Sequence, residues 1–250
     1  MERRKGRRVK RRDPALERRI DALIRDNGLT RAVATQVALG RVDLNDILRK
    51  MALNAEVDRI IRKHDLSRAL ATQVALGQAE LDAVLFKRSL AQWFEEHGMR
   101  SLLSQAQESG ELVALALHGN RNVQAKVLAV EQYEVELEID GATERMHKLQ
   151  IKWGALASHR KKVGRSLGWD KALKGQPKEP ITRPQDRYGC SNRRLYGYMD
   201  AGTTVIVRLV EGEIFKGRIT WVSRFEFGLE VKGKVEAVIF RHAMIHIGEP

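Results

Sequence analysis

Regular alternation of apolar side chains between residues 205 and 247 limits most strongly how this chain can fold. Apolar residues occupy every second position over 205–209 and again over 225–231, the period of strands with one buried face. Turns at Glu211-Gly212 and at residues 232–234 separate these stretches from further short apolar segments. Gly217, inside a predicted strand, indicates a sharp bend. The pattern predicts five short strands in a small, closed or nearly closed barrel.

A weaker copy of this pattern lies upstream, over residues 112–153. Tyr133, Val135, Leu137 and Ile139 repeat the alternation of residues 225–231 at an offset of 92, and a turn at residues 140–141 follows them. Each copy is preceded by a segment that predicts a short helix, around residues 98–107 and 191–200. The chain is therefore expected to contain two related barrels, the first one degenerate.

A different repeat occupies the N-terminal part of the chain. Residues 30–40 and 67–77 read TRAVATQVALG and SRALATQVALG, at an offset of 37. Each unit predicts three short helices, with Thr30 and Ser67 as N-caps, and the two units are expected to pack into one helical domain. The pair could form a scaffold, a helix-turn-helix-like module or an RNA-docking module. Because each central helix begins with one basic residue (Arg31, Arg68), which is few for base reading, we favour the scaffold.

Positive charge is concentrated in two segments. The net charge of the chain is +13, of which residues 1–12 carry +7 and residues 159–187 carry +6. Both segments are expected to lack regular structure, and such basic segments bind polyanions with little sequence preference. The predicted nonspecific nucleic-acid contacts in the first segment are Arg3, Arg4, Lys5, Arg7, Arg8, Lys10, Arg11 and Arg12. Those in the second are Arg160, Lys161, Lys162 and Arg165.

Residues 205–247 resemble the Sm fold, and specifically the Hfq family of RNA chaperones. The stretch VIVRLVEGEIFKGRITWVSRFEFGLE follows the family's strand–glycine–strand layout without a gap, and FRHAM at residues 240–244 is similar to its terminal Tyr-Lys-His motif. The resemblance extends more weakly to residues 112–153. It implies a ring in which edge strands of neighbouring barrels pair. Single-stranded RNA, possibly U-rich, would lie around the pore.

The resemblance also implies particular binding residues in the second copy. Phe225 would stack on a base, Arg241 would bind a phosphate or base edge, and His242 would bond a ribose or phosphate. Arg224 stands where Hfq has glutamine, which puts uracil preference in doubt. Two alternatives stay open: Phe225 as a core residue and His242 as a structural histidine.

In the first copy, Gln132 and Tyr133 match the base-binding pair and Lys148 matches the basic position, whereas Leu149 replaces the histidine. The strand from Tyr133 to Asp140 places four acidic side chains on one face, and such a face repels phosphate. We therefore expect the second copy to carry most RNA contact, while the first completes the ring or docks a basic partner.

The sequence thus predicts an α+β chain: an all-α helical repeat domain, then two small five-stranded Sm-like (SH3-like) β-barrels, each preceded by a short helix. The predicted parts are a basic tail (1–14), the helical domain (15–95), the first barrel (96–156), a basic linker rich in Pro and Gly (157–189) and the Hfq-like barrel (190–250).

An RNA-binding homo-oligomer is the expected function, as an RNA chaperone or post-transcriptional regulator. A protein-interaction scaffold and a DNA-binding regulator that acts through the helical repeats are the alternatives. The sequence has no phosphate-binding glycine loop, nucleophile–base pair or metal-ligand spacing, so we expect neither an enzyme nor a cofactor or metal site. Cys190 is the only cysteine. No apolar run is long enough to span a bilayer, and a cytoplasmic location is expected.

Overall fold

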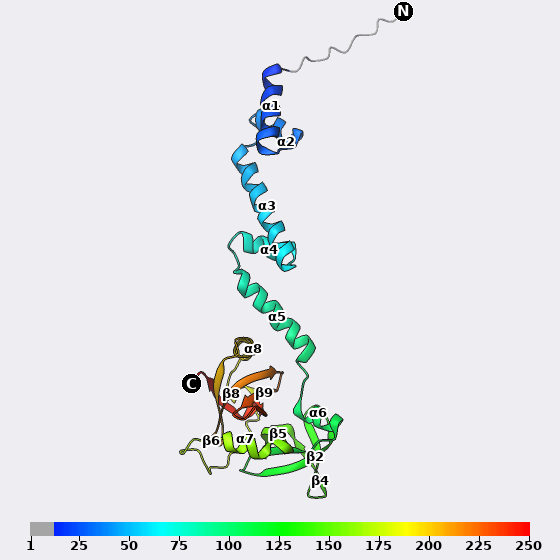
Figure 1. Cartoon of the computed structure of the whole chain (residues 1–250), viewed down its shortest axis with the longest axis vertical. Helices are drawn as coiled ribbons and strands as arrows, with labels where there is room; N and C mark the ends of the chain where they lie inside the picture. Colours follow the sequence, from blue (N-terminus) through cyan, green and yellow to red (C-terminus); the bar gives the residue numbers. More distant parts are fainter. Residues whose placement is uncertain (1–12) are drawn as a thin grey trace, which may run out of the picture. The chain divides into compact units, whose positions relative to one another are not determined.

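The computed structural model describes residues 13–250, which fall into two compact units that divide between Phe86 and Lys87. Helices make up the first unit, and a large antiparallel sheet with flanking helices makes up the second (Figure 1). The predicted α+β class is confirmed at this level. The division lies inside a helix, before the boundary at residue 95 that the repeats suggested.

The helical repeats differ in one respect from the expected three helices per unit. The helices are α1 (Pro14–Asn27), α2 (Arg31–Ala38), α3 (Leu44–His64), α4 (Arg68–Ala75) and α5 (Leu81–His97). Helix α3 joins the last helix of the first repeat to the first helix of the second. Its middle residues, Arg49 to Ala55, include neither glycine nor proline, so nothing interrupts the helix there.

Each repeat has a small core of its own. Ile20, Ala34 and Val37 pack together in the first, and Val57, Ile60 and Ala71 pack together in the second. The two apolar clusters are separate, because the long α3 lies between them along the chain. The predicted N-caps begin α2 and α4 at Thr30 and Ser67; the hydroxyl of Ser67 accepts from the Leu70 N–H at 3.4 Å, and that of Thr30 makes no such bond.

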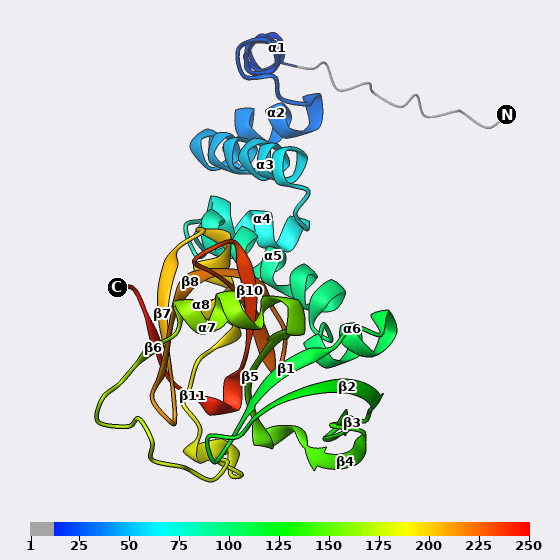
Figure 2. The ribbon, with the colours of Figure 1, turned by 60° about the horizontal axis from the view of Figure 1, so that its bottom comes forward.

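Among residues 13–250, eleven strands form one antiparallel sheet in the order β11-β7-β8-β9-β10-β5-β1-β2-β3-β4, with β6 paired to β8 (Figure 2). The strands of the first copy are β1 (Val113–Leu117), β2 (Asn122–Val130), β3 (Glu134–Ile139), β4 (Ala142–His147) and β5 (Ile151–Leu156). Those that follow are β6 (Gly168–Trp169), β7 (Thr204–Leu209), β8 (Glu213–Val222), β9 (Glu226–Val231), β10 (Val235–Phe240) and β11 (Met244–Gly248).

The two copies repeat one strand order. In each, the fifth strand pairs with the first, and the second, third and fourth follow in sequence. Strand β10 of the second copy pairs with β5 of the first, with Val238 opposite Gly154 and Ile239 opposite Trp153. The sheet is thus one path that ends at β4 and β11 and is not closed.

Each copy nevertheless has its own apolar core. Val207, Phe227 and Leu229 belong to the cluster of the second copy, and Leu115 and Leu137 belong to that of the first. The two predicted short helices are present as α6 (Leu102–Ser109), which packs on β2, and α8 (Asn192–Asp200), which packs on β8. Both helices bury a leucine completely or nearly so, which ties them to the sheet.

The segment between the copies is more regular than its composition predicts. Within residues 157–189 lie η2 (Ala157–His159), α7 (Arg160–Ser166), β6 and η3 (Pro184–Asp186). Val163 is fully buried in the core of the second copy, and Gly168 and Trp169 pair with Ile214 and Glu213. The expectation that residues 159–187 lack regular structure is therefore wrong, because one buried valine and two strand residues fix the segment to the sheet.

Candidate nucleic-acid interface

The predicted residues of the second copy lie in two adjoining pieces of chain. Arg224 and Phe225 form the turn between β8 and β9, and Arg241 and His242 begin η4 (Arg241–Ala243). The backbone N–H of Arg241 donates to the carbonyl of Phe225 at 2.9 Å. Its guanidinium donates to the carbonyls of Ser223 and Arg224, both at 3.1 Å. These bonds hold the turn and η4 together.

The guanidinium of Arg241 is also bonded on its other side. It donates to Oδ1 of Asn192 and to the carbonyl of Cys190, each at 2.7 Å. Burial lowers the pKa of Arg241 from its usual value, although arginine remains charged under all ordinary conditions. With its donors engaged by protein oxygens, Arg241 shapes the turn, and the exposed Arg224 is the cation that this turn offers to solvent.

Phe225 lies outside the core. Its side chain is 64% exposed, whereas Phe227 and Leu229, which continue its alternation, are fully buried. Strand β9 begins only at Glu226, so Phe225 belongs to the turn and not to the inward-facing row. This placement disfavours the core role of Phe225, which the sequence had left open beside base stacking.

His242 is buried at the boundary between the copies. Its imidazole is 9% exposed and lies edge-on to the ring of Phe240, with the two centroids 5.9 Å apart. Burial lowers the pKa of His242 to about 4, so the ring is neutral at physiological pH. The structural role considered for this histidine matches its position, because a buried neutral ring cannot offer a phosphate a charge.

The first copy repeats this arrangement with different side chains. Lys148 begins η1 (Lys148–Gln150), and its backbone N–H donates to the carbonyl of Tyr133 at 2.8 Å. The backbone N–H of Arg241 donates to the carbonyl of Phe225 in the same way. The Lys148 ammonium donates to the carbonyls of Glu131 and Gln132. Tyr133 is 59% exposed, and its hydroxyl accepts from the Gln132 amide at 2.9 Å.

Part of the acidic face of the first copy is paired. Arg145 on β4 forms ion pairs with Glu131 and Glu134, and Arg121 pairs with Glu144 at 2.6 Å. Glu138 is exposed on the same strand as Glu134. Tyr133 is therefore next to a strand of carboxylates, whereas Phe225 is next to Arg224.

One buried cluster of charged side chains was not predicted from the sequence. Lys152 on β5 forms ion pairs with Glu211 and Glu213 of the second copy, and all three side chains are at most 2% exposed. Glu211, interpreted from the sequence as a turn residue, also accepts from the backbone N–H groups of Gly119 at 2.7 Å and Lys178 at 2.9 Å. Burial raises the pKa of Glu211, but these hydrogen bonds outweigh it and leave the pKa below its usual value.

The only sequence signal for this cluster is a lysine inside an otherwise apolar strand, Ile151-Lys152-Trp153, which predicts a buried partner without identifying it.

The structure describes only some of the residues predicted to make nonspecific contacts with nucleic acid. Arg160, Lys161, Lys162 and Arg165 are exposed on α7. Those from Arg3 to Arg12 lie outside the described residues. Within the described chain, no group of three or more acidic, histidine or cysteine side chains could hold a metal ion, and no helix is both long and apolar enough to cross a bilayer.

Comparison of the chain with protein-family models gives no match, and comparison with curated proteins gives none either.

Proposed function

We propose that this chain is a non-enzymatic, cytoplasmic RNA-binding protein of the Hfq/Sm-like kind, an RNA chaperone or post-transcriptional regulator that binds single-stranded RNA. The observation that carries the proposal is the matching pair of turns. In both copies an exposed aromatic residue, Tyr133 or Phe225, is held by the backbone N–H of a cationic residue, Lys148 or Arg241. Exposed aromatic rings beside cations are the usual means of binding single-stranded nucleic acid.

Each copy would be a small five-stranded Sm-like (SH3-like) barrel, and chains would assemble by pairing β4 of one with β11 of the next. The pairing of β10 with β5 inside the chain supports this idea, because it joins the same two positions of the repeated strand order. Such head-to-tail contacts form closed rings when the rotation closes. Three chains would supply six barrels.

Within this assembly Phe225 and Tyr133 would stack on bases, and Arg224 would contact phosphate. Arg241 would act as a positioning residue, since its guanidinium is occupied by protein oxygens. We assign most of the affinity to the second copy, because Tyr133 lies beside the carboxylates of β3. The exposed cations of α7 would add salt-dependent attraction.

The test uses the full chain and compares U-rich and A-rich single-stranded RNA with duplex DNA, at moderate and high salt. Phe225→Ala should weaken RNA binding about tenfold or more, the effect of losing one stacked base. Tyr133→Ala should weaken it less. Leu112→Ala is the matched control, since Leu112 is an exposed apolar residue, 43% accessible, without a π-face.

Equal affinity of the Phe225→Ala and Leu112→Ala chains would contradict the proposal, and so would tighter binding to duplex DNA. A native mass equal to one chain, with and without RNA, would contradict the ring.

A scaffold role is the second candidate, and one observation favours it for the helical repeats. The basic residue that begins each central helix is paired with an acid of the preceding helix: Arg31 with Asp21 at 3.4 Å, and Arg68 with Asp58 at 2.5 Å. These pairs occupy equivalent positions in the two repeats, and they neutralise the side chains that a DNA-reading helix would need. DNA binding through the repeats is accordingly the weakest of the alternatives.

A further inference from the structure

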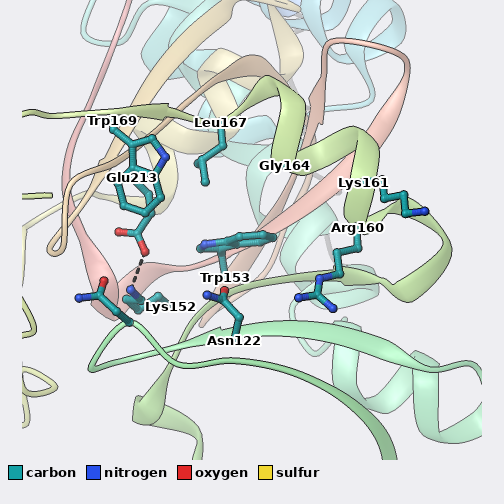
Figure 3. Close-up of a pocket in the computed structure, with 10 residues that line it drawn as sticks. Asn122, Lys152, Trp153, Arg160, Lys161, Gly164, Leu167, Trp169 and Glu213 are labelled. Carbon is teal, nitrogen blue, oxygen red and sulfur yellow. Dashed lines mark hydrogen bonds and ion pairs between the residues drawn. The ribbon is translucent and has the colours of Figure 1, made fainter. Parts of the chain in front are cut away.

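A cavity of about 540 Å³ lies where the segment between the two copies crosses the sheet (Figure 3). Its walls come from β5, the start of β8, helix α7 and strand β6, and neither aromatic turn lines it. The volume lies within the range of about 300–1,000 Å³ that is typical of small-molecule sites.

Two tryptophans give the cavity flat apolar surfaces. Trp153 is held by the ring of Phe215, whose centroid lies 5.4 Å away at an interplanar angle of 71°. Trp169 is 38% exposed and carries the ammonium of Lys174 at 5.4 Å from its ring centroid. Because β6 pairs with β8, Trp169 stands opposite Glu213 in the strand ladder. Indole rings suit a planar aromatic ligand.

Two buried polar atoms of lining residues have no hydrogen-bond partner within the described part of the chain. They are Oε2 of Glu213, an acceptor, and Nε1 of Trp153, a donor. Oε1 of Glu213 accepts from Lys152 at 2.5 Å, and the whole side chain is 2% exposed. Both atoms lie beneath the surface of the cavity, so a ligand would contact the indole of Trp153 and not these two atoms.

A cation lies on the other side of the indole of Trp153. Figure 3 shows the guanidinium of Arg160 directed toward the cavity beside Asn122, whereas the ammonium of Lys161 points outward. Arg160 is exposed, and no carboxylate of the described residues lies within ion-pair distance of it. An unpaired guanidinium binds phosphate with two parallel hydrogen bonds.

We propose that this cavity binds one nucleotide, either a free nucleoside monophosphate or a single residue of an RNA strand. The base lies against the indoles of Trp153 and Trp169. The phosphate lies at Arg160, away from the buried carboxylates. An inorganic anion would leave both indoles unused, and a purely apolar ligand would leave the guanidinium of Arg160 unpaired. This site is separate from the aromatic turns and does not rest on their function.

The experiment is calorimetric titration of the full chain with AMP, CMP, GMP, UMP, adenosine and inorganic phosphate. Trp169→Ala should weaken nucleotide binding about tenfold or more through the lost stacking, and Trp169→Phe should retain most of the affinity. Arg160→Gln should weaken the binding of AMP about tenfold or more and leave the binding of adenosine unchanged. Lys232→Gln is the matched control, since Lys232 is an exposed cation in the turn between β9 and β10 that does not line the cavity.

The same variants are then titrated with a short single-stranded RNA. Loss of affinity for the mononucleotide assigns the site to free nucleotides; loss for the RNA alone assigns it to a residue of a bound strand. A Tyr133→Ala, Phe225→Ala chain should bind AMP as the parent does, so failure at the turns is distinguishable from failure here. The inference is overturned if neither ligand responds to Trp169→Ala and Arg160→Gln, or if Lys232→Gln weakens binding equally.

Discussion

The ammonium of Lys152 lies 2.5 Å from Oε1 of Glu213, and both side chains are buried at the contact between the two copies. Lys152 also pairs with Glu211, so one cation of the first copy balances two carboxylates of the second. Backbone N–H groups from Gly119, Asn120 and Lys178 complete the shell of Glu211. Three separate pieces of chain thus depend on a single carboxylate.

Removing the cation should therefore destabilise the second unit strongly. Lys152→Met leaves two buried carboxylates without their partner, and breaking a buried pair in this way typically costs about 3–5 kcal/mol. Lys126→Met on β2 is the matched control, because Lys126 is exposed, and it should change stability little. Denaturant unfolding followed by tryptophan fluorescence measures both. Equal midpoints for the two variants would contradict this account.

Arg224 should act on RNA affinity through charge alone. Its side chain is exposed, and its backbone N–H, which donates to the carbonyl of Gly98 at 3.2 Å, is retained in any variant but proline. In Arg224→Gln the slope of log K against log salt concentration should fall by about one, the value for one lost phosphate contact. Binding titrations across a salt series measure the slope, and thermal unfolding should be unchanged. An unaltered slope would remove Arg224 from the interface.

Gly217 permits the close approach of β8 and β9. A Cβ atom at this position would lie 2.2 Å from the carbonyl oxygen of Glu230, a backbone atom that cannot move aside. Gly217→Ala should therefore destabilise the second unit by about 1–3 kcal/mol. The first copy has alanine at the equivalent position, so Ala125→Gly should cost only about 0.5–1 kcal/mol, a cost of backbone freedom. Chemical unfolding measures the stability of both variants. A smaller loss of stability for Gly217→Ala than for Ala125→Gly would contradict this account.

Glu226 should make stability depend on pH near neutrality. Burial raises its pKa to about 7 from an ordinary value of 4.5, against opposing hydrogen bonds from Ser101 and the Leu102 N–H. The folded protein thus holds this proton more tightly than the unfolded chain. Its contribution is complete below pH 4.5 and is lost as the pH rises through about 7.

Glu226→Gln should abolish this loss, so the variant should gain stability relative to the parent between pH 5 and 8, by up to about 3 kcal/mol. The buried His242, whose pKa is lowered to about 4, acts oppositely below pH 6.5 and is common to both proteins, so the difference isolates Glu226. Thermal unfolding over this pH range measures it. A constant difference between the proteins would show that Glu226 does not titrate there.

Local patterns predicted the elements well where the pattern itself has a physical period. The alternation over residues 205–247 matches β7, β8 and β9 closely, because a two-residue period arises whenever one face of a strand is buried. Phe225 is an exception to the alternation of buried side chains. It continues the alternation in the sequence, yet it precedes the first residue of β9 and faces solvent.

Composition predicted the structure wrongly in one segment, and the sequence repeat did so in another. Residues 159–187 have the charge and proline content of a flexible linker, yet the single buried side chain of Val163 fixes α7 to the core. The second case is α3, where the repeat suggested two helices. Repeats show which residues are equivalent, but only the chain between them decides whether a helix stops.

By itself the sequence determined the strands of the two copies, the short helices that precede each copy, the repeat relations and the residues that belong to equivalent turns, since all of these follow from local periodicity. The tertiary structure decided which strands meet at the joint of the two copies. It placed Lys152 against Glu211 and Glu213, buried His242 and grouped Trp153, Trp169 and Arg160 around one cavity. These contacts join residues far apart in the chain, and they depend on the packing of complete elements, which no local pattern encodes.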